Sequence, residues 1–263
     1  MNLNDVVVLI PYFNDREGIQ KTLASIDESV NVLIVDDGSE APLVKDNLIA
    51  EFTMLNISTI RFDVNKGIVA ALNVGLDYAL SNGFKYVARL DSGDTVIGER
   101  FLRQKEFLVS EPSVKLVGGW ANFVDENGGF LFQLKHPLHN LALASTFFKY
   151  NPFLHPAVMF DICVYEKLGG YPNNFDALED YAYFWEVSKY FSVANLPLVM
   201  LNYEVSANSI SSKKRLAQSI SKIKLIIRHF DFSFLAFYGL IKSILLLLIP
   251  RHITTLIKTL LWR

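Results

Sequence analysis

Cysteine is almost absent from this sequence. The single thiol, Cys163, excludes an intramolecular disulfide and a cysteine-rich zinc site. Glycine is also scarce, with 14 residues in 263, and no repeat is found along the chain, which excludes collagen-like and repeat-array proteins. Because 51% of the residues are hydrophobic and only 20% are charged, an intrinsically disordered chain is excluded too. The composition therefore indicates a folded protein with a hydrophobic core of its own.

The first residues lack the features of a secretory signal. Residues 1–5 carry no basic cluster, and the apolar run that follows, Val6–Ile10, is too short for the hydrophobic region of a signal peptide. We therefore expect the protein to stay in the cytoplasm.

The net charge of −2 conceals an uneven distribution of charge. Residues 211–263 carry ten Lys or Arg and one acid, Asp231, so this segment is +9 and residues 1–210 are −11. The basic segment is also the most apolar one, since Lys242 is the only charge between Phe232 and Ile249. Basic residues interleaved with a Leu/Ile-rich run do not form a polar groove, so we expect no nucleic acid as a partner.

This basic and apolar segment predicts association with an anionic membrane surface. Residues 232–249 form a run of 18, which is the lower limit for spanning a bilayer, and a lysine lies in the middle of it. Amphipathic and hydrophobic helices lying on the inner face of the plasma membrane therefore fit better than a span. The alternatives are an oligomer interface or helices packed on the globular part.

Short apolar runs alternate with helical patterns over the first 110 residues. The expected strands are 6–10, 31–35, 57–62 and 85–90, and the expected helices are 16–28, 43–51, 67–80 and 100–109. This alternation is typical of βαβ units, so we expect an α/β fold with a Rossmann-like, mainly parallel sheet flanked by helices.

The pattern becomes mixed after residue 114. The expected elements are a strand over 114–118, a hairpin turning at 126–129, a helix over 138–150, a short strand over 157–160, a helix over 177–190 and a last strand over 197–203. No linker rich in Pro, Gly or Ser separates the two halves. We therefore expect residues 1–210 to form one domain and residues 211–263 to form a helical tail.

Two acidic clusters each follow an apolar strand directly. Asp36 and Asp37 follow the second strand, and Asp91 and Asp94 follow the fourth. Because the carboxyl ends of parallel strands meet at one edge of a sheet, the four carboxylates should converge there. Converging carboxylates need a cation or hydrogen-bond donors, and Mg²⁺ or Mn²⁺ shared with a nucleoside diphosphate meets that need.

Several of the acidic residues also have a purely structural interpretation. Asp, Gly and Ser are common in turns and at helix starts, so both acidic clusters could cap the helices that follow them. The pair Glu179–Asp180 falls in the first turn of a helix, where the helix dipole favours acids. A lone histidine beside proline, such as His155, is more often packed and hydrogen-bonded than bound to a metal.

A series of motifs distributed along the chain resembles the family 2 glycosyltransferases, which have the GT-A fold. The motifs are 8–14 (VLIPYFN), 35–39 (VDDGS), 65–68 (NKGI), 70–73 (AALN), 88–94 (ARLDSGD), 99–101 (ERF), 155–160 (HPAVMF), 169–171 (GGY) and 179–181 (EDY). Each motif is weak alone, but their order and spacing over residues 4–212 make the resemblance specific.

The resemblance implies a nucleotide-sugar site. The residues implied in binding the donor are Pro11, Tyr12, Asp36, Asp37, Asn65, Lys66, Gly67, Arg89 and Asp91. Asp91 to Asp94 stand at the DxD position, which binds a divalent metal on the diphosphate, so Asp91 and Asp94 are the implied ligands of Mg²⁺ or Mn²⁺. His155 is a further candidate ligand. The donor would be a UDP-, dTDP- or GDP-sugar.

The resemblance also implies a catalytic base. Asp180 would take the proton from an acceptor hydroxyl in an inverting transfer, for which its carboxylate must lie within roughly 3 Å of that hydroxyl. The implied activity is that of a hexosyltransferase-type glycosyltransferase acting on a lipid-linked saccharide or a polysaccharide. Its product would enter a cell-surface glycan such as an O-antigen or a capsule.

The motif at residues 91–94 departs from the family pattern. The pattern reads Asp-x-Asp-Asp, whereas this chain reads Asp91-Ser92-Gly93-Asp94. Glycine therefore occupies a slot that is often a direct metal ligand. Either Asp91 and Asp94 serve instead, or metal binding is weaker. The alternative function is a non-catalytic sugar-nucleotide-binding or scaffolding protein of the same fold.

Overall fold

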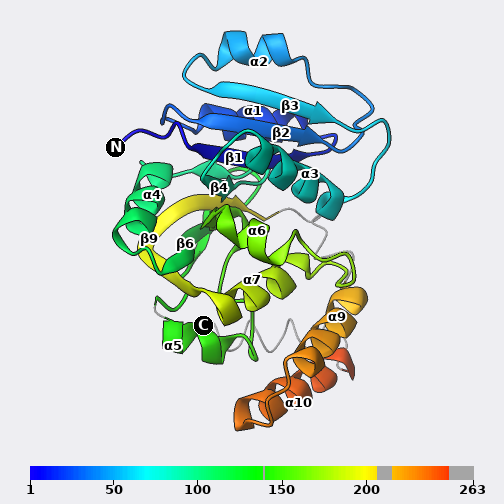
Figure 1. The fold of residues 1–263 in the computed structure, drawn as a ribbon. Coiled ribbons are helices and arrows are strands. Elements are labelled where there is room, and N and C mark those ends of the chain that lie inside the picture. Colours follow the sequence, from blue (N-terminus) through cyan, green and yellow to red (C-terminus); the bar gives the residue numbers. More distant parts are fainter. Residues whose placement is uncertain (139, 206–214, 249–263) are drawn as a thin grey trace.

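Helices cover both faces of one sheet in the computed structural model, which describes residues 1–138, 140–205 and 215–248 (Figure 1). The strands are β1 (Val6–Tyr12), β2 (Asn31–Asp36), β3 (Asn56–Arg61), β4 (Tyr86–Arg89), β5 (Thr95–Val96), β6 (Val114–Val124), β7 (Phe130–Leu134), β8 (Met159–Asp161) and β9 (Ser192–Glu204). The helices are α1 (Arg16–Ala24), α2 (Lys45–Glu51), α3 (Ile68–Ser81), α4 (Arg100–Ser110), α5 (Asn140–Thr146), the short 3₁₀ helix η1 (His155–Ala157), α6 (Cys163–Leu168), α7 (Glu179–Tyr190), α9 (Arg215–Arg228) and α10 (Phe234–Leu248).

The sheet has a parallel half and a mixed half. Across the described residues the strand order is β3-β2-β1-β4-β8-β6-β9-β5, with β7 paired to β6 outside this path. Strands β3, β2, β1 and β4 are mutually parallel, β8 runs antiparallel to both of its neighbours, and β6 and β9 are parallel to each other. The predicted α/β class and the parallel first half are confirmed.

Alternation along β1 divides the core into two layers. Val7 and Leu9 face the layer formed with α3 and α7, whereas Val6, Val8 and Ile10 face the layer formed with α1 and α4. Every one of these side chains is buried because helices cover both faces of the parallel half. Continuous apolar runs in the sequence therefore correspond to strands buried on both sides.

The first and last strands have other boundaries than the sequence predicted, and two short elements were not predicted. The first strand does not stop at Pro11 but continues through it to Tyr12, with Pro11 in register opposite Val35. The last strand begins at Ser192 and not at residue 197, because residues 192–195 pair in register with β6. The two-residue strand β5 and the short helix α6 carried no sequence signal long enough to predict them.

The last described helices, α9 and α10, pack on each other beside α7 (Figure 1). Helix α10 has an unusual arrangement of side chains: Ala236, Gly239 and Ser243 face the protein, whereas Phe234, Ile241 and Leu245 are exposed by 83%, 56% and 52%. Several large apolar side chains of this helix therefore point away from the core, whereas Leu235 and Leu240 pack against it.

No helix in the described part of the chain combines the length and the hydrophobicity that a bilayer crossing requires. The predicted boundary after residue 210 and the predicted tail residues 249–263 lie outside the described residues.

A glycine near the carboxyl end of β2 supplies a test of the fold. Gly38 has φ +75°, and a Cβ there would lie 2.5 Å from the backbone carbon of Val64. Gly38→Ala should lower the free energy of unfolding by about 2–4 kcal/mol, because it adds a steric clash to the cost of a left-handed conformation. Chemical denaturation measures this difference.

Gly83→Ala is the matched control. Gly83 has a similar φ, +73°, but nothing lies within 4 Å of its added Cβ, so only the backbone cost of about 1 kcal/mol applies. Equal losses in the two variants would contradict the close packing at Gly38.

Candidate active site

A cavity of about 650 Å³ opens at the carboxyl ends of the parallel strands. It brings together seven of the residues predicted to bind a nucleotide sugar: Pro11, Tyr12, Asp37, Asn65, Lys66, Gly67 and Asp91. The cavity also reaches the start of α7 at Glu179. Asp36, Arg89, Asp94, His155 and Asp180 do not line it. The predicted convergence holds for one carboxylate of each acidic cluster, Asp37 and Asp91, and not for Asp36 or Asp94.

Asp37 joins β2 to the start of α3. Its carboxylate accepts hydrogen bonds from the backbone N–H groups of Lys66, at 2.6 Å, and Gly67, at 2.9 Å. Two charge-assisted bonds to adjacent N–H groups fix the course of this loop. Asp37 thereby shapes the wall of the cavity that residues 65–67 form.

Asp36 lies behind that wall and is 3% exposed. One carboxylate oxygen accepts from the N–H of Ser39 at 2.9 Å, and the other accepts from the Arg61 guanidinium at 2.7 Å. These bonds match the structural interpretation of this residue. Contact between Asp36 and a nucleotide stays a prediction.

Two buried arginines lie beneath the second acidic cluster. The Arg89 guanidinium, 1% exposed, donates to Asp91 Oδ1 at 2.6 Å and to the carbonyl of Leu90. Arg100 donates to the carbonyl of Arg89 at 2.8 Å, and burial lowers its pKa to about 9. Asp91 therefore lines the cavity with one oxygen tied to a cation behind it.

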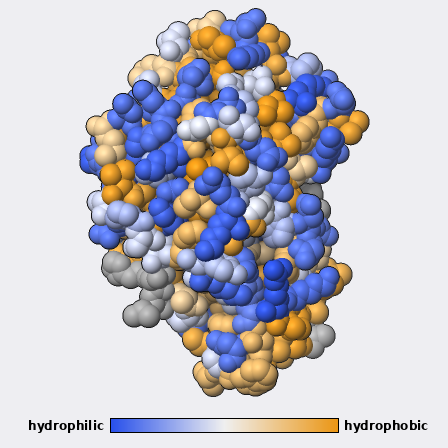
Figure 2. Space-filling model, in the orientation of Figure 1, coloured by the Kyte–Doolittle hydropathy of each residue, from blue (hydrophilic) through white to orange (hydrophobic). Residues whose placement is uncertain are grey.

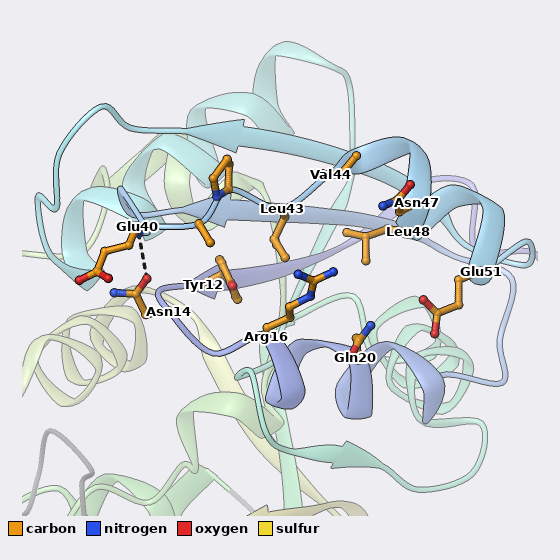
Figure 3. Close-up of a pocket in the computed structure, with 12 residues that line it drawn as sticks. Tyr12, Asn14, Arg16, Gln20, Glu40, Leu43, Val44, Asn47, Leu48 and Glu51 are labelled. Atoms are coloured by element: carbon orange, nitrogen blue, oxygen red, sulfur yellow. Dashed lines mark hydrogen bonds between the residues drawn. The ribbon is translucent and has the colours of Figure 1, made fainter.

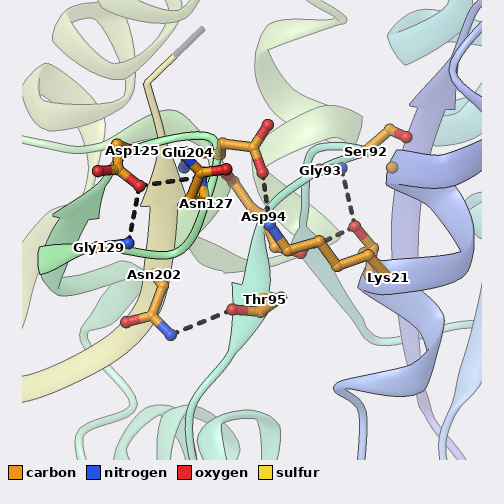
Figure 4. A network of polar contacts seen from close by, with 12 residues as sticks. Lys21, Ser92, Gly93, Asp94, Thr95, Asp125, Asn127, Gly129, Asn202 and Glu204 are labelled. Atoms are coloured by element: carbon orange, nitrogen blue, oxygen red, sulfur yellow. Dashed lines mark hydrogen bonds and ion pairs between the residues drawn. The ribbon is translucent and has the colours of Figure 1, made fainter.

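Asp94 faces β9 and not the cavity (Figure 4). Its Oδ1 accepts from the N–H of Glu204 at 3.0 Å, while its Oδ2 is buried with no hydrogen-bond partner among the described residues. Burial, together with repulsion from Asp91, raises the pKa of Asp94 well above its ordinary value. The carbonyl of Asp94 accepts from the Thr22 hydroxyl at 2.8 Å. Through these contacts Asp94 connects the loop at residues 91–94 to β9 and to α1.

Asp180 is the second residue of α7 and lies next to Glu179, which lines the cavity. Its Oδ2 accepts a hydrogen bond from the side-chain amide of Asn151 at 3.0 Å. Burial of the carboxyl group, and then repulsion by Glu179, raise the pKa of Asp180 to about 7. A carboxylate with a pKa near the working pH is suited to take a proton as a general base.

His155 is packed among aromatic side chains. Its Nε2 lies 3.1 Å from the hydroxyl of Tyr171, and its ring stands edge-on to Phe184 at a centroid distance of 5.6 Å. Burial, with a smaller contribution from the charge of Arg89, lowers the pKa of His155 well below its ordinary value. This environment matches the interpretation of His155 as a packed residue, and ligation of a metal by it stays a prediction.

Other residues that line the cavity were not predicted from the sequence. They are Phe13, Asp15, Ile68, Val69, Ala71, Ser92, Asn173, Phe175, Asp176, Ala177 and Glu179. Asp15 caps α1 by accepting from the N–H of Gly18, and its other oxygen accepts from the Ser92 hydroxyl at 2.7 Å. Its position directly after the 8–14 motif is the signal that could have identified it.

The chemistry of these groups bears on a metal. Among the described residues, no three His, Cys, Asp or Glu side chains are grouped so that they could hold a metal ion. Mg²⁺ usually takes one or two carboxylates and completes its coordination with phosphates and water. Asp91 therefore fits a cation that arrives with a diphosphate. The structure does not bring Asp94 or His155 to the cavity, so their ligation of a metal stays a prediction.

A second cavity, of about 480 Å³, lies between α1 and α2 (Figure 3). Arg16 and Gln20 line it from α1, and Asn47 and Glu51 line it from α2. Tyr12 lines both cavities. This second cavity holds none of the predicted acidic residues.

Comparison with known proteins gives consistent results for sequence and fold. Residues 7–165 match the family model described as glycosyl transferase family 2. An Escherichia coli UDP-Gal:alpha-D-GlcNAc-diphosphoundecaprenol beta-1,3-galactosyltransferase is 25% identical, over 91% of this chain and 85% of the relative. The amylovoran biosynthesis glycosyltransferase AmsE of Erwinia amylovora is 27% identical, over 79% of each chain.

Two solved structures share the fold at low identity. S. aureus TarS 1-349 in complex with UDP-GlcNAc aligns with a TM-score of 0.64 and 16% identity, over 91% of this chain and 69% of that one. The mannosyltransferase PcManGT from Pyrobaculum calidifontis, in complex with GDP-Man and Mn²⁺, also aligns with a TM-score of 0.64 and 16% identity, over 92% and 69%. The predicted GT-A fold is confirmed.

The bonds of Asp37 to the backbone generate a prediction about nucleotide binding. Asp37→Asn should weaken the binding of UDP and GDP about tenfold, because an amide has one acceptor oxygen and leaves one N–H of residues 66–67 unpaired. Isothermal titration calorimetry with each nucleotide measures the effect. Asp63→Asn, at an exposed position four residues before Gly67, is the control and should bind as the wild type does. An unchanged affinity in Asp37→Asn would separate this loop from nucleotide binding.

Proposed function

The chain belongs to glycosyl transferase family 2, and from that membership we propose an inverting hexosyltransferase that transfers a sugar from a nucleotide donor to a lipid-linked saccharide or a polysaccharide. The observation that carries the proposal is Asp180, a carboxyl group with a pKa of about 7 beside the cavity at the start of α7. Inversion requires one base on the acceptor side and no covalent intermediate on the enzyme. A single tuned carboxylate meets that requirement.

The donor would lie along the carboxyl ends of β1 and β2. Phe13 is 47% exposed on the cavity wall, so its aromatic ring could stack on the nucleobase of the donor. Lys66 brings a positive charge to the same cavity. Pro11, Tyr12 and residues 65–67 would enclose the nucleoside. The proposed donor is a UDP-, dTDP- or GDP-sugar; solved structures of the same fold in complex with UDP-GlcNAc and with GDP-Man support the UDP and GDP forms.

The proposed transfer forms one bond at the anomeric carbon and breaks another. The acceptor hydroxyl oxygen attacks the anomeric carbon while the bond from that carbon to the phosphate oxygen breaks, and the nucleoside diphosphate leaves with the electron pair. Asp180 takes the hydroxyl proton. Asp91 would hold a divalent cation, Mg²⁺ or Mn²⁺, and such a cation stabilises the negative charge on the departing diphosphate when it is bound.

The name of one relative and the exposed apolar surface of α10 both support a lipid-linked acceptor. The E. coli relative is named for a diphosphoundecaprenol-linked acceptor. Hydrophobic side chains gather at the end of the molecule formed by α9 and α10 (Figure 2), where Phe234, Ile241 and Leu245 are exposed. The +9 charge of residues 211–263 favours an anionic surface. We therefore place the protein on the inner face of the plasma membrane, in the synthesis of a surface glycan such as an O-antigen or a capsule.

Asp180→Asn tests the proposed base. This change keeps the size of the side chain but removes the proton acceptor, so release of nucleoside diphosphate should fall at least about 100-fold. A panel of UDP-, dTDP- and GDP-sugars with Mg²⁺ or Mn²⁺ identifies the donor, and calorimetry should show that donor affinity is kept. Wild-type activity in Asp180→Asn would remove Asp180 as the base.

The pH profile supplies an independent check on the same residue. The base must be ionised, so kcat/KM should rise with pH through about 7 and then level off. Glu179→Gln removes a repelling charge and should move this rise to lower pH. A rise that stays in place in Glu179→Gln would assign it to another group.

The exposed face of α10 generates a prediction about membranes. The double variant Phe234→Ser/Ile241→Ser should reduce binding to phosphatidylglycerol-containing vesicles at least about tenfold, since each side chain contributes roughly 1.5–3 kcal/mol when it leaves water. Co-sedimentation with the vesicles measures it. Leu131→Ser is the control, because Leu131 is 49% exposed on β7, outside α9 and α10. Unchanged sedimentation of the double variant would contradict a role for this face.

A further inference from the structure

A five-residue segment, Phe147–Asn151, lies between α7 and the helix pair α9–α10; we name it the linking segment. Helix α7 holds it at both ends. The Tyr181 hydroxyl donates to the carbonyl of Phe147, and the side-chain amide of Asn151 donates to Asp180 Oδ2 at 3.0 Å. The linking segment thus ends directly on the proposed base.

The middle of the linking segment is held from the other side. Lys222 of α9 donates from Nζ to the carbonyl of Lys149 at 2.8 Å. Gly239 of α10 lies so close to the carbonyl of Phe148 that no side chain fits between them. Three consecutive residues, 147 to 149, are therefore fixed between α7 and the two tail helices.

A second contact from α9 reaches the cavity wall. Gln218 donates from its side-chain amide to the carbonyl of Ala177 at 3.1 Å. Ala177 lines the cavity two residues before Glu179, and its φ of +54° is a left-handed conformation that a residue with a side chain adopts only when its surroundings hold it there. Helix α9 therefore contacts both segments that lead to Asp180, one through Lys149 and the other through Ala177.

Lys222 is suited to a structural bond of this kind. It is half-buried, and burial together with the charge of Lys242 lowers its pKa to about 8. A buried ammonium needs an acceptor, and the Lys149 carbonyl is the one it has among the described residues. Loss of this bond would release the carbonyl two residues before Asn151.

We propose that α9 and α10 position the catalytic base: Asn151 orients the Asp180 carboxylate, and Lys222, Gln218 and Gly239 act through the segments on either side of it. This inference rests on the proposed role of Asp180. The physical basis is the steep dependence of proton transfer on geometry, since a displacement of about 1 Å can cost on the order of 100-fold in rate. All four residues act through Asp180 and are therefore positioning residues, Asn151 by direct contact with it.

The test compares Asn151→Ala, Lys222→Met and the double variant in the full-length protein. The assay measures release of nucleoside diphosphate from the donor that the wild-type protein accepts. Each single change should lower kcat about tenfold with KM for the donor within twofold, and the double variant should be no slower than Asn151→Ala. Lys224→Met, an exposed lysine one half-turn away on α9, is the control and should keep wild-type kcat.

The pH profile separates an effect on the position of Asp180 from a general loss of stability. In Asn151→Ala the Asp180 carboxylate loses a hydrogen-bond donor, so its pKa should rise and the increase of kcat/KM should move to higher pH. The charges of Glu179, which raises the pKa of Asp180, and of Arg89, which lowers it, stay the same in this variant. Lys222→Met should move it in the same direction by a smaller amount. Wild-type kcat in both single variants, or losses that simply add in the double variant, would overturn the inference.

The activity of Asp180→Asn distinguishes a failure of the proposed function from a failure of this inference alone. If Asp180→Asn keeps full activity, the base assignment and this inference fail together. If Asp180→Asn is inactive while Asn151→Ala and Lys222→Met match the wild type, the base stands and only the positioning by α9 and α10 is wrong.

Discussion

A buried cation at the carboxyl end of β4 is the charge on which the site depends. Arg89 is 1% exposed, so its guanidinium requires anions nearby, and it has Asp91 at 2.6 Å. The same charge lowers the pKa values of Asp94 and Asp180, against the burial that raises them. Carboxylates that would otherwise repel one another can therefore share one edge of the sheet. Arg100, bonded to the carbonyl of Arg89, keeps that backbone in place. Arg89 compensates the acidic motif at residues 91–94, whereas Arg61 and backbone N–H groups compensate the motif at residues 36–37.

Sequence patterns were sufficient where the structure is local. The parallel half follows from apolar runs and helical periods, and its strand ends bring Asp37 and Asp91 to one cavity, as the sequence predicted. The patterns were not sufficient where a residue's direction depends on a distant partner. Asp94 turns toward Glu204 and His155 turns toward Tyr171, and neither direction follows from the residues around them in sequence. The motif placed these two residues near the site, and long-range pairing decided which way they face.

For the helices after residue 210, too, the sequence predicted the elements but not how they face the rest of the protein. Composition alone predicted helices with exposed apolar and basic side chains there, and the described residues include the helices α9 and α10. It could not predict which side of α10 faces the protein, because that helix is apolar all round. Size contributes to this orientation, since Gly239 lets the helix approach the backbone of Phe148, where a Cβ would clash. Phe234, Ile241 and Leu245 are left exposed, while Leu235 and Leu240 pack against the core.

The position of β9 has a consequence for the order in which this protein forms. β9 is the last strand among the described residues, yet it lies between β6 and β5, and its final residue, Glu204, bonds to Asp94 across 110 positions of sequence. Contacts over such separations form slowly, because a long loop must close before they stabilise anything. During synthesis, strands β1 to β4 can pair while residues 91–94 still lack this partner. We therefore expect the edge of the sheet at residues 91–94 to be completed late in folding, after the ribosome has released residue 204.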